Sequence, residues 1–257
     1  MNGRPRYYDV RLDAETLRRA MRLVNANAAL WAVGNGLVST LLVIYLANEL
    51  GATGVMVSLI LAAPRFAGLL RLAVPALIRQ VKSRKAVCTV GFAASTIVLL
   101  AVPAIAVLQL SSASTIWLSI LVTAWCGYKV LEYVAAVALW SWIGDLTPRR
   151  IRGRLLGRRE QWQGLGRLAG MAISIALALV WAYVLPTAPR AQPLALSAVA
   201  GAVLMMAAVV PLVALPAATR APSAVPHAPW RTLGRALLDP AYRRLIVFWF
   251  WFSIVTA

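Results

Sequence analysis

The stretch GDLTPRRIRGRLLGRRE, residues 144–160, separates two of the most apolar segments of the chain, residues 115–143 and 163–185. It is strongly basic, because six arginines accompany only two acidic residues. Each flanking segment is long enough to cross the hydrocarbon core of a bilayer as a helix, which takes roughly 20 residues. The stretch therefore predicts a charged connection between two membrane-spanning helices. Its arginines are Arg149, Arg150, Arg152, Arg154, Arg158 and Arg159.

The composition of the whole chain indicates the same environment. Hydrophobic residues make up 61% of the 257 residues and charged residues only 13%, and the mean hydropathy is +0.76, outside the soluble range. A basic leader precedes the first apolar run, but that run is longer than the apolar region of a signal peptide and lacks a small-residue cleavage site. We therefore predict an all-α integral membrane protein. Lys and Arg are absent from residues 23–64, 86–128, 168–189 and 191–219.

Six apolar segments are expected to form a transmembrane bundle over residues 27–216. A seventh begins at Leu245 but has only 13 residues before the sequence ends, fewer than the roughly 20 that a spanning helix needs. We therefore expect a fragment that includes a cytoplasmic N-terminal amphipathic segment over 1–26, a cytoplasmic linker over 217–244 and a truncated seventh helix over 245–257. The six spans are 27–48, 54–78, 86–108, 115–143, 163–185 and 193–216.

The distribution of basic residues predicts the orientation. Of the 26 Lys and Arg residues, 21 lie in the N-terminal segment, the loops after the second and fourth spans, and the linker, whereas the alternate loops hold only Arg190. The positive-inside rule then places the N-terminus in the cytoplasm, with the plasma (inner) membrane as the expected location. The same partition accounts for the net charge of +18 without a nucleic-acid partner. Asp13 is the expected cap of an amphipathic helix that lies along the cytoplasmic interface before the first span.

The order of these segments resembles the N-terminal half of a major facilitator superfamily transporter. Asp145, Pro148, Arg152 and Gly153 are similar to the acidic-x-x-Pro-x-x-x-Arg-Gly pattern that follows the fourth helix in that family. The loop after the second span, IRQVKSRKAV, keeps the family's basic residues but has neither its Gly nor its Asp. The segments GATG and DPAYRRL are also similar to family sequences.

This resemblance implies a fold and a function. Six helices would form two three-helix repeats, and this half would rock against a second half, missing here, around a site near the bilayer midplane. The implied function is that of a secondary active permease, coupled to an ion such as the proton, that moves a small molecule by alternating access. A non-transporting receptor or assembly factor on the same scaffold is the main alternative.

Polar residues inside the apolar segments are candidates for the substrate and proton pathway, because ionisable groups in hydrocarbon are costly. They are Asn35, Arg65, Lys129 and Glu132. A cation could hold an anionic group in a central cavity and Glu132 could exchange a proton. A purely structural pair, either Arg65 with Glu132 or Lys129 with Glu132, explains the same residues equally well. Arg167 is expected to snorkel to the cytoplasmic surface.

Asp145 and the basic residues near it are candidates for a cytoplasmic gate. The hypothesis is that Asp145 pairs with Arg152 or with one of Arg79, Lys82 and Arg84, and so stabilises one conformation. Solvated charges attracted to anionic lipids remain an alternative for Arg149, Arg150, Arg158 and Arg159.

No enzyme, metal or cofactor signature stands out. Cys88 and Cys126 lie in apolar runs, and the single histidine, His227, lies in the Pro-rich linker, so neither a metal site nor a catalytic triad is expected. No Walker motif is present, which gives no support to ATP-driven transport. The spacing of Gly166 and Gly170 favours close packing of membrane helices over a nucleotide loop.

Overall fold

The computed structural model describes residues 13–69, 74, 83–108, 115–185, 191–216, 238–240, 243–244, 247–248 and 251. The chain divides into two units, Met1–Ala218 and Thr219–Ala257. The division falls close to the expected start of the linker at residue 217. Most of the linker and of the expected seventh helix lies outside the described residues.

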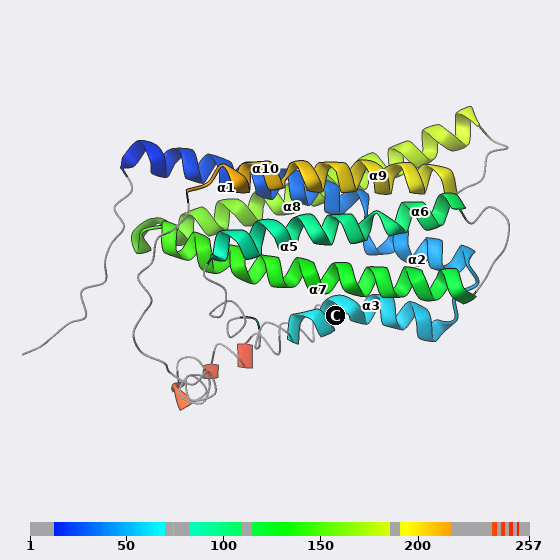
Figure 1. The fold of residues 1–257 in the computed structure, drawn as a ribbon, viewed down its shortest axis with the longest axis horizontal. Helices are drawn as coiled ribbons and strands as arrows, with labels where there is room; N and C mark the ends of the chain where they lie inside the picture. Colours follow the sequence, from blue (N-terminus) through cyan, green and yellow to red (C-terminus); the bar gives the residue numbers. More distant parts are fainter. Residues whose placement is uncertain are drawn as a thin grey trace, which may run out of the picture. The chain divides into compact units, whose positions relative to one another are not determined.

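The regular elements of the first unit are helices throughout its described residues (Figure 1). Five helical segments are long and apolar enough to cross a membrane: Glu15–Glu49, Arg84–Ile105, Thr115–Leu146, Arg150–Val184 and Gln192–Val213. The segment Gly54–Gly68 is apolar but shorter, and most of the rest of the expected second span lies outside the described residues. These segments make the protein an all-helical one with the features of an integral membrane protein. The helices are α1 (Ala14–Leu37), α2 (Thr40–Glu49), α3 (Gly54–Leu69), α5 (Arg84–Leu99), α6 (Ala101–Leu108), α7 (Thr115–Leu146), α8 (Arg149–Val184), α9 (Ala191–Ala207) and α10 (Val209–Val213).

Short polar side chains start three of these helices. The carboxylate of Asp13 accepts a hydrogen bond from the Thr16 amide at 3.1 Å, which confirms Asp13 as the cap of α1. Ser39 and Ser83 cap α2 and α5 in the same way. Such side chains satisfy amide groups that have no partner inside the helix. The helix that begins after Asp13 continues through residues 26 and 27 to Leu37, so the amphipathic segment and the first half of the first span form one helix. Val38 and Ser39 then interrupt the span before α2.

The basic stretch is largely helical, which differs from the expected charged connection. Helix α7 ends at Leu146 and α8 begins at Arg149, so only Thr147 and Pro148 lie between them. Pro148 ends the preceding helix because its ring does not fit a helix interior, while Arg and Leu are good helix formers. The 36 residues of α8 extend about 54 Å, well beyond the roughly 30 Å of a hydrocarbon core. The arginines of residues 144–160 therefore occupy the part of α8 that extends beyond the hydrocarbon core.

Helix α1 packs closely against both α8 and α9. A Cβ atom placed on Gly166 of α8 would lie 2.9 Å from the carbonyl oxygen of Ala29, and one on Gly34 of α1 would lie 2.6 Å from the carbonyl oxygen of Gly201 in α9. Gly170 likewise lies against the backbone of Gly36. The predicted role of the Gly166 and Gly170 spacing in helix packing is confirmed.

The α8 face away from α1 is largely uncovered. Only 11% of the apolar window of this helix is buried within the chain, and large side chains such as Leu168, Ile175 and Leu179 are exposed. An apolar surface of this length is stable only in contact with lipid or another protein surface. Its exposure therefore fits a helix that lies at the boundary of the bundle.

Candidate functional site

The polar residues of α7 lie near the middle of the helix. Glu132 is 17 residues after Thr115 and 14 residues before Leu146, or about 26 and 21 Å along the axis. Lys129 lies one turn earlier on nearly the same face. Both side chains are mostly buried, with 10% of Lys129 and 15% of Glu132 exposed. They therefore lie at the depth where a charge is most expensive in a bilayer.

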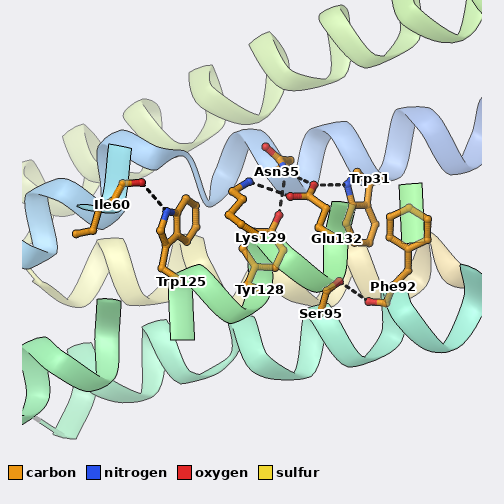
Figure 2. A network of polar contacts seen from close by, with 9 residues as sticks. All are labelled: Trp31, Asn35, Ile60, Phe92, Ser95, Trp125, Tyr128, Lys129 and Glu132. Atoms are coloured by element: carbon orange, nitrogen blue, oxygen red, sulfur yellow. Dashed lines mark hydrogen bonds and ion pairs between the residues drawn. The ribbon is translucent and has the colours of Figure 1, made fainter. Parts of the chain in front are cut away.

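The carboxylate of Glu132 receives three hydrogen bonds (Figure 2). Trp31 Nε1 and Asn35 Nδ2 donate to its Oε1 atom, each at 3.1 Å. Lys129 Nζ donates to the Oε2 atom at 2.9 Å and forms an ion pair with it. Because α1 supplies two of these donors and α7 the third, the carboxylate links the two helices.

The ammonium group of Lys129 is also held by two aromatic rings. Its Nζ atom lies 4.8 Å from the ring centre of Trp125 and 4.6 Å from that of Tyr128. The negative face of an aromatic ring attracts a cation, and more strongly where water is excluded. Lys129 is thus a buried cation with one anionic partner and two ring contacts.

Asn35 connects the Tyr128 hydroxyl to the same network. Its Nδ2 atom donates to the Tyr128 hydroxyl oxygen at 3.0 Å as well as to Glu132. Trp31 and Asn35 are four residues apart on α1, and Tyr128 and Glu132 are four apart on α7, so each pair lies on one helix face. We call these five residues the central polar network: Trp31, Asn35, Tyr128, Lys129 and Glu132.

The structure brings together three of the four residues expected in the substrate and proton pathway. Asn35, Lys129 and Glu132 touch directly instead of facing one another across an open cavity. The local Lys129–Glu132 pair, one of the two structural alternatives, is present. Arg65 is exposed on α3 and is not among the described partners of Glu132.

Trp31 and Tyr128 were not expected in this network. Aromatic residues in an apolar helix give no sign of a polar contact by themselves. The sequence does contain one signal, the spacing of four residues. It places Trp31 on the same helix face as Asn35, and Tyr128 on the same face as Glu132.

Arg167 lies closer to this network than its expected position near the cytoplasmic surface suggests. It is 18 residues after Arg149 and 17 before Val184, about 26 Å from either end of α8, and its backbone carbonyl oxygen lies against Gly36, which follows Asn35 on α1. Arg65 lies 11 residues into α3, about 16 Å along its axis. With Lys129, the described residues place three cations and one carboxylate, that of Glu132, near the middle of the bundle.

A second group of charges lies where α5 and α8 begin. Arg84 forms an ion pair with Asp145 across α5 and α7, so one of the expected partners of Asp145 is found. Arg152 donates to the carbonyl oxygens of Gly144 and Thr147 and so caps the C-terminal end of α7. Basic side chains near a helix C-terminus satisfy carbonyls that have no amide partner. Arg79 and Lys82, the other expected partners, lie outside the described residues.

Arg159 does not fit the expectation of a solvated charge. Only 4% of this residue is exposed. Its guanidinium lies 4.7 Å from the ring centre of Trp140, and the Glu160 carboxylate is 3.9 Å away. Because α8 is helical here, Arg159 is buried while its neighbours Arg158 and Glu160 are exposed.

The described residues contain no cluster of three or more His, Cys, Asp and Glu side chains that could hold a metal ion. Cys88 and Cys126 are free thiols in separate helices, α5 and α7. His227, the single histidine expected in the linker, lies outside the described residues. Comparison with family models, with curated proteins and with solved structures finds no match for this chain.

Proposed function

We propose that this chain forms half of a secondary active transporter of the major facilitator type, which moves a small anionic solute together with a proton. The observation that carries the proposal is the central polar network near the middle of α1 and α7. Ionisable groups at that depth are functional candidates because an apolar pair of the same shape would be cheaper to bury.

The Lys129–Glu132 pair suggests how proton and solute are coupled. While Glu132 is ionised, it neutralises the Lys129 ammonium. A proton bound at Oε2 of Glu132 removes that negative charge, and the ammonium is then free to attract an anionic group of the solute. When the proton leaves, Lys129 returns to the carboxylate and releases the anion. Proton and anion therefore bind together and leave together.

Two further cations support an anionic solute. Arg65 and Arg167 are exposed on α3 and α8, and both lie near mid-depth in the bundle. A guanidinium in contact with lipid tails at that depth would be very unfavourable, so these faces require water, an anion or a second protein surface. An aqueous pathway between this bundle and a second half of the transporter would supply all three.

The Arg84–Asp145 pair is the proposed cytoplasmic latch. It joins the start of α5 to the end of α7, and these two helices pack along their length. Movement that separates the two ends would break the pair, so the pair favours one of the two states of an alternating-access cycle.

The test is proton flux in proteoliposomes that contain the complete protein and an internal pH-sensitive dye. Mono- and dicarboxylates and phosphate esters, added outside, are expected to drive proton entry, and choline and other organic cations are not. Glu132→Gln should abolish the coupled flux. Glu49→Gln is the control, because Glu49 is an exposed acid at the end of α2. If no solute of any charge drives proton flux and none is taken up into the proteoliposomes, the receptor or assembly-factor alternative is favoured.

A further inference from the structure

A groove of about 610 Å³ lies between the first turns of α1 and the basic part of α8. Helices α1 and α8 diverge here, beyond the close contacts at Gly166 and Gly170. Its wall is cationic and partly aromatic, and none of the described residues that line it is acidic. The side chains that define it are Arg18, Met21, Arg22 and Asn25 of α1 and Arg158 and Trp162 of α8.

The depth of the groove matches the headgroup layer of a bilayer. Arg22 is 27 residues before Glu49 at the far end of the first span, and Arg158 is 26 residues before Val184 at the far end of α8. The separation on α8 corresponds to about 40 Å of continuous helix, and the one on the first span has a similar number of residues with an interruption at Val38 and Ser39. A bilayer is about 40–45 Å thick with its headgroups and about 30 Å without them. The guanidinium groups therefore lie level with lipid phosphates.

The groove has two kinds of polar partner to offer. Arg22 and Arg158 supply guanidinium groups, which bind phosphate oxygens well. Asn25 also lines the groove. Its side-chain oxygen is buried and accepts no hydrogen bond from the described residues, so a turn of the amide toward the groove would give this oxygen a donor on the ligand. A ligand with both a phosphate and a hydroxyl group would satisfy both.

The surroundings favour a lipid over a soluble anion. Trp162 lies in the wall with 42% of its surface exposed, and indole side chains prefer the headgroup layer. Leu165, one turn deeper on α8, is 61% exposed and continues an apolar surface on which acyl chains can lie.

We infer that this groove binds the headgroup of an anionic phospholipid that carries hydroxyl groups, of which phosphatidylglycerol is the simplest. The phosphate lies between Arg22 and Arg158, and a glycerol hydroxyl donates to the side-chain oxygen of Asn25 after the amide turns toward the groove. The inference depends on the groove alone and is independent of the proposed transport function.

Native mass spectrometry of the complete protein in detergent tests the inference. The protein is titrated with dioleoyl-phosphatidylglycerol and, separately, with dioleoyl-phosphatidylcholine. The variant R22Q/R158Q is compared with R150Q/R154Q, which removes the same charge from exposed α8 residues outside the groove. Wild type and R150Q/R154Q should retain phosphatidylglycerol, and R22Q/R158Q should retain it at least five-fold less. Equal losses in the two variants, or equal retention of the two lipids by wild type, would overturn the inference.

Two further measurements test whether the bound phosphate belongs to a lipid or to a soluble anion, and whether a headgroup hydroxyl contacts Asn25. Inorganic phosphate or glycerol 1-phosphate at millimolar concentration should not displace the lipid, and displacement would assign the groove to a soluble anion instead. Wild type should prefer phosphatidylglycerol over phosphatidic acid, which has no headgroup hydroxyl. Asn25→Ala should lose this preference while it still binds both lipids, and an unchanged preference would contradict the hydroxyl contact. Circular dichroism melts establish that each variant is folded.

Discussion

At the scale of single residues, the Lys129–Glu132 pair has a stability effect that depends on both partners. Glu132→Gln would leave Lys129 as a buried cation with no anionic partner, which typically destabilises a protein by about 3–5 kcal/mol. The double variant K129M/E132Q removes both charges and should be much closer to wild type. Thermal unfolding in detergent of the two single variants and the double variant measures the difference. Additive losses would mean that the two charges do not depend on each other.

The residue scale also shows what could be predicted from the sequence and what could not. Asn35, Lys129 and Glu132 were foreseen because a polar group in an apolar segment is conspicuous. The partner of Asp145 was narrowed to four residues but not chosen, since the choice depends on how α5 lies against α7. The burial of Arg159 was not foreseen, because it requires the helical register of α8.

At the scale of helices, the contact between α1 and α8 should give two glycine-to-alanine substitutions in α8 opposite effects on the stability of the protein. Glycine to alanine normally stabilises a helix interior by up to about 1 kcal/mol. That gain is expected for Gly164→Ala, since nothing lies within 4 Å of a Cβ atom added there. A Cβ atom on Gly170 would lie 2.9 Å from Gly36 Cα, a backbone atom that cannot move alone. Gly170→Ala should therefore destabilise the protein by about 1–3 kcal/mol.

Thermal unfolding of the two glycine variants in the same detergent gives the comparison. The melting temperature should rise slightly for Gly164→Ala and fall for Gly170→Ala. Equal shifts in one direction would show that helix propensity outweighs packing at this contact.

The start of α1 should depend on pH through Asp13. The hydrogen bonds from Thr16 hold the pKa of the Asp13 carboxyl below its ordinary value of 3.8. Because the folded-state pKa is the lower one, the stabilisation by the cap is complete above pH 3.8 and is lost as the pH falls through the folded-state pKa. Hydrogen exchange at the Thr16 amide, corrected for its intrinsic pH dependence, should therefore speed up in that window. Asp13→Asn, which caps without titrating, should show no such change.

The sequence predicted the presence of the long helices better than it predicted their boundaries. Long apolar segments identified five spans, because about 20 apolar residues have few alternatives to a membrane helix. The boundary at Arg149 was missed because positive charge outside the membrane is compatible with either a loop or a projecting helix. The local signal was Pro148, which can end one helix and precede the next.

At the scale of the whole bundle, the basic residues gather at one end and do more than set orientation. Lys85, at the start of α5, donates to the carbonyl oxygens of Val213 and Leu215 at the end of α10, both at 2.7 Å. Arg152, at the start of α8, does the same for the end of α7. In each case a cation near the beginning of one helix satisfies the end of an antiparallel neighbour. The charge asymmetry that predicts orientation therefore also contributes to the fold.

The orientation itself can be tested with an impermeant thiol reagent on intact cells. Cys88→Ala and Cys126→Ala remove the native thiols, and single cysteines then replace Glu15 at the basic end and Thr53 or Thr115 at the opposite end, all exposed positions. Because 21 of the 26 basic residues lie in the segments predicted to be cytoplasmic, we expect the basic end to be cytoplasmic. The cysteines at 53 and 115 should react from outside, and the one at 15 only after permeabilisation. The reverse pattern would contradict the orientation but leave the carbonyl capping intact. Disagreement between positions 53 and 115 would contradict the arrangement of the helices, because both lie at the end opposite the arginines.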